Sequence, residues 1–220
     1  MTASSTPAQE LIRTGRELVD LGLSPGASGN VSVRDGDRVL LSGTGTRLGR
    51  LTEEDLALTS LDGEHLGGAR ASKETPLHLG FYRRDERFRA VIHLHSPWAA
   101  AFSCTAPWAG HSAVPPLTPY FVMRVGQTPL LPYRPPGDPA LGTDLEQAAG
   151  PFRAALLANH GPVVAGADLA EALERCIEVE EACRLALLTA TADRRTLSDA
   201  QVTELATTWG SPWTPAPHGG

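Results

Sequence analysis

Residues 88 to 95 read Phe-Arg-Ala-Val-Ile-His-Leu-His, an apolar run that ends on two histidines. The run has the length and apolar content of a buried strand. Because side chains two residues apart in a strand point to the same face, His93 and His95 are expected to project together. Two imidazoles on one face can bind one ion at roughly 2.0–2.1 Å. This stretch therefore predicts a strand and part of a metal site.

Two further residues extend this predicted site. His160 ends a second apolar run, at a strand end where a loop leaves room for a substrate. Glu74 opens a predicted helix and could supply a fourth ligand or a general base, or could be a solvated residue at a helix start. Imidazole and carboxylate ligands without thiolate suit Zn²⁺, which we prefer, and also Mn²⁺, Co²⁺ or Fe²⁺. Three histidines with open positions describe a catalytic site.

Helical and strand patterns alternate around this stretch. The Pro-rich segment 114–139 is expected to form extended segments and loops, because the residue before a proline disfavours helix. A Pro- and Gly-rich tail from about residue 209 is expected to be mobile. Spacing and turn signals predict helices over residues 7–22, 77–83, 97–104 and 168–190, and hairpins of residues 31–33 with 39–41 and 154–160 with 163–165.

Composition limits the class of protein. A chain of 220 residues with 41% hydrophobic and 20% charged residues is typical of one globular domain, which we expect to span residues 1–220. The net charge of −6 argues against a nucleic-acid partner. No apolar stretch reaches the ~18 residues of a membrane span, and we expect no membrane partner. The three cysteines follow no C-x-x-C pattern and are expected to be reduced core thiols, which favours a cytoplasmic location.

Three donor-rich turns could bind an anion. Residues 24–30 and 42–46 combine glycines with hydroxyl side chains, and Ser72 and Lys73 add a hydroxyl and a cation beside Glu74. Any one of them alone would more often be an ordinary turn. Neither G-K-[ST] nor G-x-G-x-x-G occurs, so a nucleotide cofactor is not expected.

Five motifs occur in a fixed order along the chain: G-A-S-G-N-V-S at 26–32, T-G at 44–45, S-K-E-T-P-L-H at 72–78, H-L-H-S at 93–96 and A-N-H-G-P at 158–162. Together they resemble the class II aldolase/adducin family, over roughly residues 8 to 200. The resemblance implies an α/β fold, a three-layer α/β/α sandwich around a mostly antiparallel sheet. It also implies a homotetramer with sites between subunits.

The resemblance assigns roles to particular residues. It implies a metal bound by His93, His95, His160 and Glu74, with Glu74 also the acid/base. Tyr120 would be a second proton donor, reaching a neighbouring subunit's site, unless it only packs in the proline-rich loop. The phosphate-binding positions would be Gly29, Asn30, Thr44, Gly45, Ser72 and Lys73.

The sugar-phosphate aldolases of this family typically have S-S-E where Ser72, Lys73 and Glu74 stand here. With Lys73 and the proline-rich segment, the chain looks like the branch that decarboxylates 3-oxo-tetronate 4-phosphate. That implies a small phosphorylated sugar-acid substrate, which loses carbon dioxide through a metal-bound enediolate to give dihydroxyacetone phosphate. The alternatives are an L-fuculose-phosphate-type aldolase or a 4-epimerase, and a non-catalytic adducin-like interaction module.

Three more polar residues have two possible roles each. Arg124 and Arg134 could pair with the substrate's carboxylate or phosphate, since a guanidinium suits bidentate recognition, or could be surface residues. His78 lies four residues after Glu74 on the same predicted helix face, where it could support Glu74 or pack in the core.

Overall fold

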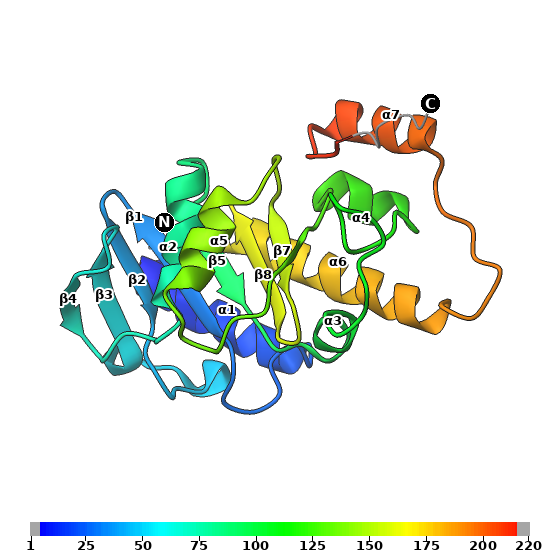
Figure 1. Cartoon of the computed structure of the whole chain (residues 1–220). Coiled ribbons are helices and arrows are strands. Elements are labelled where there is room, and N and C mark those ends of the chain that lie inside the picture. The colour runs from blue at the N-terminus through cyan, green and yellow to red at the C-terminus, as the bar shows by residue number, and fades with distance from the viewer. Residues whose placement is uncertain (1–4, 215–220) are drawn as a thin grey trace.

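The computed structural model describes residues 5–214, and their strands form a single eight-stranded sheet (Figure 1). The strand order is β4-β3-β2-β1-β5-β8-β7-β6, antiparallel except for the parallel pair of β6 and β7. The strands are β1 (Asn30–Asp35), β2 (Arg38–Ser42), β3 (Leu56–Ser60), β4 (His65–Gly68), β5 (Ala90–His93), β6 (Leu130–Leu131), β7 (Ala154–Leu157) and β8 (Gly161–Gly166). The mostly antiparallel sheet implied by the family resemblance is confirmed.

The strand β5, which ends on His93, lies at the centre of this sheet. All four residues of β5 are buried, between β1 and β8. Successive side chains point to opposite faces: Ile92 packs in one apolar core and Val91 in the other. Both predicted hairpins form, β1 with β2 and β7 with β8. The β3–β4 hairpin was not predicted, because β4 is short, largely exposed and ends on two glycines.

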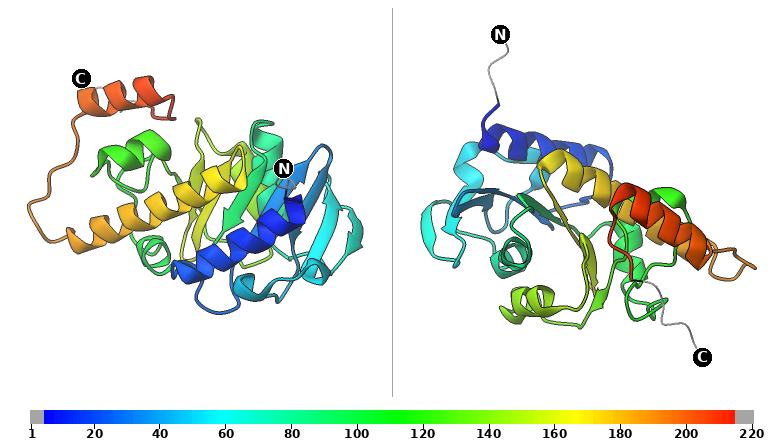
Figure 2. Two further views of the ribbon diagram at one scale, coloured as in Figure 1. Left: turned by 180° about the vertical axis from the view of Figure 1, so that it is seen from behind. Right: turned by 90° about the horizontal axis from the view of Figure 1, so that it is seen from above.

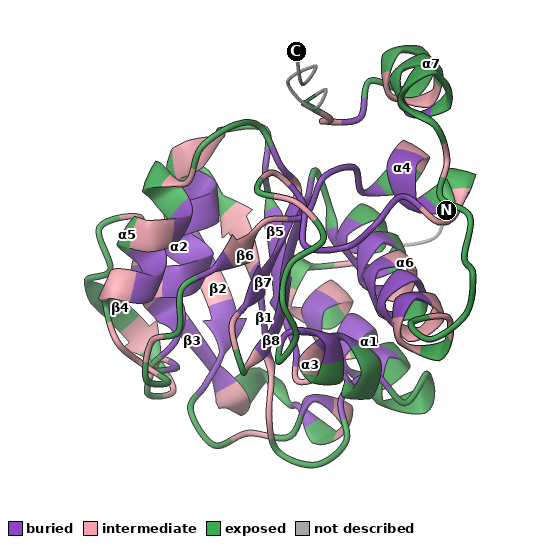
Figure 3. Ribbon diagram, turned by 45° about the vertical axis from the view of Figure 1, so that its right-hand side comes forward, coloured by how far each residue is buried: buried purple, intermediate pink, exposed green. Residues whose placement is uncertain are grey.

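Helices cover both faces of the sheet, which makes three layers (Figure 2). The helices α1, α3, α4 and α6 pack on one face, and α2 and α5 pack on the other, so buried residues lie on both sides of the strands (Figure 3). No helix among residues 5–214 is long and apolar enough to cross a membrane. The helices are α1 (Pro7–Asp20), α2 (Thr75–Arg84), α3 (Pro97–Phe102), α4 (Pro119–Arg124), α5 (Ala140–Gln147), α6 (Leu169–Leu188) and α7 (Asp199–Trp209).

The proline-rich segment differs from its prediction, because it contains the helix α4. Thr118 caps this helix by accepting a hydrogen bond from the backbone N–H of Phe121 at 3.3 Å, and Pro119 occupies the first turn. Proline disfavours helix for the residue before it but is favoured at the first helical position, where its missing N–H costs nothing. The prolines therefore start a helix here.

The expectation for the cysteines is corrected in part. Cys176 and Cys183 are buried in α6, but Cys104 is exposed after α3 and is not a core thiol. The predicted tail begins at residue 209, yet Trp213 packs against the ring of Phe121, with 6.5 Å between ring centroids. Thr214 donates its backbone N–H to the Gln127 side chain at 2.6 Å. The remainder of that tail, residues 215–220, lies outside the described residues.

Candidate metal centre

Four side chains converge at one end of β5. One ligand atom from each of Glu74, His93, His95 and His160 lies within 4.8 Å of all the others. The Nε2 atoms of His95 and His160 are 3.0 Å apart. The Glu74 carboxylate lies 3.6 Å from His93 Nε2 and 3.4 Å from His160 Nε2. The residues predicted to share an ion are therefore brought together.

Different local structures position the four groups. His93 is the last residue of β5, so His95 follows the strand instead of lying in it as predicted, and it reaches the cluster from the loop before α3. His160 lies in the turn between β7 and β8, after Asn159, whose φ of 56° is left-handed. Asn tolerates that conformation better than most residues. Glu74 is the residue that precedes α2.

The protonation states of these groups suit a cation. Burial lowers the pKa of His93 to about 3 and also lowers the pKa of His95, so both imidazoles are neutral at neutral pH. His93 donates from Nδ1 to the carbonyl of Pro162 at 2.9 Å, which leaves Nε2 as an acceptor with no partner among the described residues. Burial raises the pKa of Glu74, but a hydrogen bond with His160 and the electrostatic influence of His93 hold it well below its usual range. Neutral imidazoles and a carboxylate fit a divalent ion.

A buried chain of polar side chains holds Glu74 in place. Asn30 donates to the Glu74 carboxylate at 2.7 Å, and the Asn30 carbonyl oxygen contacts His78 Nε2. His78 Nδ1 lies 2.7 Å from the Ser32 hydroxyl, which lies 2.6 Å from the Tyr82 hydroxyl. Burial lowers the pKa of His78 to about 4, so this ring is neutral. His78 thus supports Glu74 through Asn30 and is not among the four converging groups.

Glu180 is a supporting residue that the sequence analysis missed. From α6 its carboxylate accepts hydrogen bonds from the Ser96 hydroxyl at 2.6 Å and from the backbone N–H groups of Trp98 and Ala99 at 2.8 and 2.9 Å. It therefore caps α3 directly after His95. The sequence did contain a signal for this residue: Glu180 is a charged residue on the apolar stripe of α6, four residues after Cys176. A buried carboxylate requires such partners.

The predicted phosphate-binding turns border the cluster. A Cβ atom at Gly29 would lie 2.9 Å from the carbonyl oxygen of His93. Only glycine therefore allows this turn to approach β5 so closely. Asn30 and Ser72 are buried and contact each other at 3.4 Å. Thr44 and Gly45 are exposed, in a turn tied to the segment before Ser72 by the hydrogen bond from Thr44 N–H to the Arg70 carbonyl at 2.9 Å.

The loop after β6 is brought to the same place. Lys73 is exposed, and its aliphatic stem packs against Gly137, where a Cβ atom would lie 3.0 Å from Lys73 Cδ. Lys73 is also close enough to His95 for its charge to lower the pKa of that imidazole, after the larger effects of burial and of His160. One exposed cation therefore stands beside the four converging groups.

Three other predicted residues lie outside the cluster. Tyr120 is exposed on α4, with the guanidinium of Arg124 5.6 Å from the centre of its ring. Arg124 pairs with Glu174 at 2.6 Å, and Arg134 pairs with Asp144 at 2.7 Å. Both arginines are therefore occupied by carboxylates of their own chain.

Known proteins share this arrangement of sequence and fold. The model of the Class II Aldolase and Adducin N-terminal domain matches residues 9–187. A 3-oxo-tetronate 4-phosphate decarboxylase from Haemophilus influenzae is 40% identical over 196 residues, which cover 89% of this chain and 93% of the relative. An L-fuculose phosphate aldolase from Methanocaldococcus jannaschii is 33% identical over 183 residues, 82% of this chain and 95% of the relative.

A solved structure agrees with these relatives. The crystal structure of a candidate aldolase/epimerase/decarboxylase from Klebsiella pneumoniae superposes with a TM-score of 0.86 at 37% identity, covering 90% of this chain and 97% of the other. With its buried group of three histidines and a glutamate, the chain belongs to the class II aldolase and adducin family as a metal-dependent lyase, most like a decarboxylase.

Proposed function

We propose that this enzyme decarboxylates 3-oxo-tetronate 4-phosphate to dihydroxyacetone phosphate. The observation that carries the proposal is the cluster of His93, His95, His160 and Glu74 with Lys73 beside it, in a chain 40% identical to decarboxylases of this name. The carboxylate to be lost and the phosphate to be held are both anions, and the cluster borders turns rich in N–H and hydroxyl donors.

The reaction breaks one carbon–carbon bond. In the 2-hydroxy-3-keto acid, the C1–C2 bond cleaves, carbon dioxide leaves, and the electron pair is delocalised between C2 and the C3 oxygen. A proton then adds to C2, which gives dihydroxyacetone phosphate. Glu74, His93, His95 and His160 would hold a divalent ion, with zinc preferred, and this ion would supply Lewis-acid stabilisation of the developing oxyanion.

The chain's own residues orient the substrate and move the proton. Glu74 is the proposed proton carrier, because its carboxylate is held by Asn30 at a fixed place beside the histidines. Ser72 and Lys73 adjoin Glu74 in sequence, and they are proposed to bind the phosphate together with the positions at residues 29, 30, 44 and 45. The ammonium of Lys73 offers a point charge suited to a phosphate group.

We further propose that the enzyme works as a cytoplasmic homotetramer, in which Tyr120 reaches the site of a neighbouring subunit as a second proton donor. The exposed position of the Tyr120 side chain leaves it accessible to another chain. Size-exclusion chromatography with light scattering tests the tetramer. The rate of the Tyr120→Phe variant tests the donor role.

An aldolase activity is the second candidate, because the chain is also 33% identical to an L-fuculose phosphate aldolase. The deciding experiment compares carbon dioxide release from both enantiomers of 3-oxo-tetronate 4-phosphate with aldehyde release from L-fuculose 1-phosphate. We expect carbon dioxide from one enantiomer and little aldehyde. Aldehyde release without carbon dioxide would reverse the order of the two proposals.

A further inference from the structure

A second polar region lies at the opposite end of the sheet. β8 starts at Gly161, next to the metal centre, and ends at Gly166, five residue steps or roughly 17 Å away. Ala167, directly after β8, lines a cavity of about 930 Å³. A cavity of this size is within the range of small-molecule sites. The cavity is therefore separate from the cluster of Glu74 and the three histidines.

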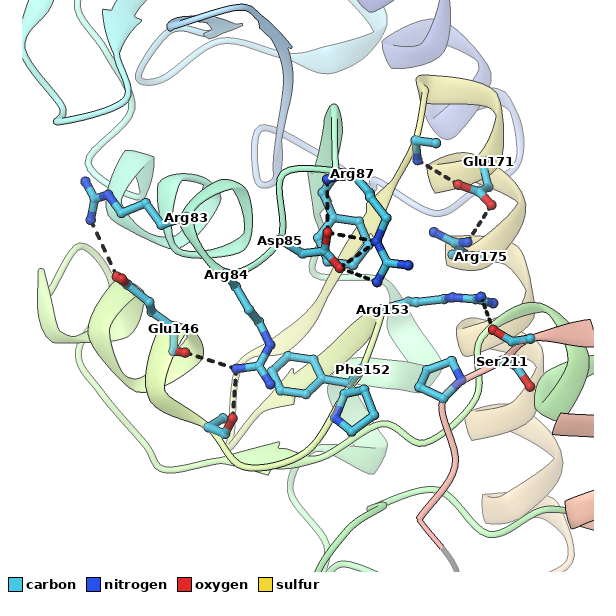
Figure 4. A pocket seen from close by; sticks show the side chains of 16 residues that line it. Arg83, Arg84, Asp85, Arg87, Glu146, Phe152, Arg153, Glu171, Arg175 and Ser211 are labelled. Carbon is cyan, nitrogen blue, oxygen red and sulfur yellow. Dashed lines mark hydrogen bonds and ion pairs between the residues drawn. The ribbon is translucent and has the colours of Figure 1, made fainter. Parts of the chain in front are cut away.

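The cavity is positively charged although the chain as a whole is acidic. Five arginines and only three carboxylates line it, an excess of two positive charges in a protein of net charge −6. These arginines come from the end of α2, from the residues before β5 and β7, and from α6, and Figure 4 shows several of them around one space. A concave, positively charged surface concentrates anions.

Three of these arginines already have carboxylate partners. Arg87 pairs with Asp85 at 2.6 Å, Arg175 pairs with Glu171 at 2.5 Å, and Arg83 pairs with Glu146 at 3.8 Å. Arg153, in contrast, has no carboxylate within 4 Å among residues 5–214. An arginine that has no paired counter-ion and lies near two other arginines is electrostatically unfavourable. A bound anion would offset this repulsion.

The hydrogen bonds of Arg153 leave it facing the cavity. It donates from Nη2 to the Gly210 carbonyl at 2.6 Å and from Nη1 to the Arg124 carbonyl at 3.4 Å, and Figure 4 shows its side chain running toward Ser211. Burial lowers the pKa of Arg153, the charge of Glu171 partly opposes this, and the charge of Arg87 lowers it further. The two carbonyls fix the guanidinium in place without neutralising it.

A polar atom without a partner lies in the same wall. Ser211 lines the cavity and is only 8% exposed, and its hydroxyl has no hydrogen-bond partner among the described residues. Buried hydroxyls normally have partners. The Ser211 hydroxyl without a partner and the Arg153 guanidinium, which forms no ion pair among the described residues, both fit a polar ligand in this cavity.

We propose that this cavity is a binding site for a phosphate group, separate from the metal centre. Phosphate matches the site, because its several acceptor oxygens can take N–H donors from Arg153 and Arg87 and a hydroxyl donor from Ser211. The cavity is larger than a phosphate ion, and Phe88 and Phe152 supply apolar walls. A small organic phosphate ester therefore fits the site as well as the free ion.

The test is calorimetric titration of the metal-loaded enzyme with inorganic phosphate and, separately, glycerol 2-phosphate. The variants are Arg153→Gln, Arg87→Gln and a control, Arg16→Gln, which removes the same charge from the exposed face of α1. We expect about tenfold weaker binding in the first two and unchanged binding in the control. Arg87 is exposed, so this variant decides the matter if Arg153→Gln fails to fold.

A Lys73→Ala variant separates the cavity from the metal centre. Phosphate binding that persists in Lys73→Ala and depends on Arg153 supports the cavity site, and tighter binding of glycerol 2-phosphate than of inorganic phosphate identifies an ester as its ligand. Equal binding by Arg153→Gln, Arg87→Gln and Arg16→Gln would overturn the proposal. Loss of all phosphate binding in Lys73→Ala would overturn it as well.

Discussion

The two ends of the sheet differ in how their charged groups are held. We call the end with Glu74, His93, His95 and His160 the metal end, and the end with the arginines of the cavity the arginine end. At the metal end, His93 and Glu74 are buried and held by hydrogen bonds to other groups, so that their free atoms face one point. At the arginine end, Arg84 and Arg153 donate to backbone carbonyls, and Arg84 also lies 3.9 Å over the ring of Phe152. One end offers electron pairs to a cation, and the other offers N–H donors to an anion.

The comparison shows what makes a site rigid. Glu74 is fixed through Asn30 by a buried chain that reaches Tyr82 in the core. Arg87 is exposed and fixed only by Asp85, two residues away. We therefore expect substitutions at the metal end to cost far more than substitutions at the arginine end.

The largest expected effect is that of Glu74→Gln. Loss of the carboxylate removes a proposed metal ligand that is also the proposed proton carrier, so kcat for carbon dioxide release should fall about 10²–10⁴-fold. Glu181→Gln is the control, because this exposed carboxylate pairs only with Arg184, and the variant should retain the wild-type rate. A rate within threefold of wild type in Glu74→Gln would contradict the role given to this residue.

Next in size is His78→Gln, which tests the chain behind Glu74. Without the imidazole, Asn30 loses the contact that sets its amide orientation, and metal affinity should fall roughly 10–100-fold. Competition with a chromogenic chelator measures this affinity. Tyr82→Phe, which removes only the far end of the chain, should have a much smaller effect, and equal losses in both variants would indicate a general packing defect.

Glu180→Gln should lower the free energy of unfolding by about 1–3 kcal/mol, because buried donors at the start of α3 lose a charged acceptor. Urea denaturation measures the change. The adjacent Glu181→Gln is the control: this residue is exposed and pairs only with Arg184, so the variant should be close to wild type. Similar losses in both would mean that the cap does not stabilise the fold.

The smallest expected effect is at the arginine end. The hydrogen bond from Arg87 lowers the pKa of Asp85 in the folded protein. A lowered folded-state pKa adds stability above the pKa of the unfolded chain, and this contribution is lost as the pH falls through the folded-state pKa. In Arg87→Gln, NMR titration should find the Asp85 pKa nearer its ordinary value and a slightly weaker acid dependence of stability. An unchanged pKa would contradict the pairing.

Sequence reasoning found the metal end because its signals are local. His93 and His95 are two residues apart, and Glu74 stands in a run of polar residues before a helix. The arginine end has no such signal. Arg84, Arg153 and Arg175 are far apart in the chain, and only the folded sheet brings them to one edge. The carbonyls that accept their hydrogen bonds belong to the backbone, which no side-chain pattern reveals.

The fold was predictable to a similar degree and for the same reason. Apolar runs gave β5 and the two flanking hairpins, since alternation and turn residues are read within about ten positions. The helices α4, α5 and α7 and the strands β3, β4 and β6 were missed. β4 is exposed and β6 has two residues, so neither carries a periodic pattern. β6 depends on pairing with β7, which lies farther along the chain, whereas β4 pairs with its neighbour β3.

The cap formed by Glu180 also has a consequence for how the protein is made. The four proposed metal ligands lie between residues 74 and 160, but the carboxylate that secures the start of α3 lies twenty residues beyond the last of them. During synthesis, a nascent chain would contain every ligand before the loop carrying His95 has its anchor. Stable metal binding should therefore follow the docking of α6. Because α6 is synthesised after all four of these residues, we expect the metal to bind late.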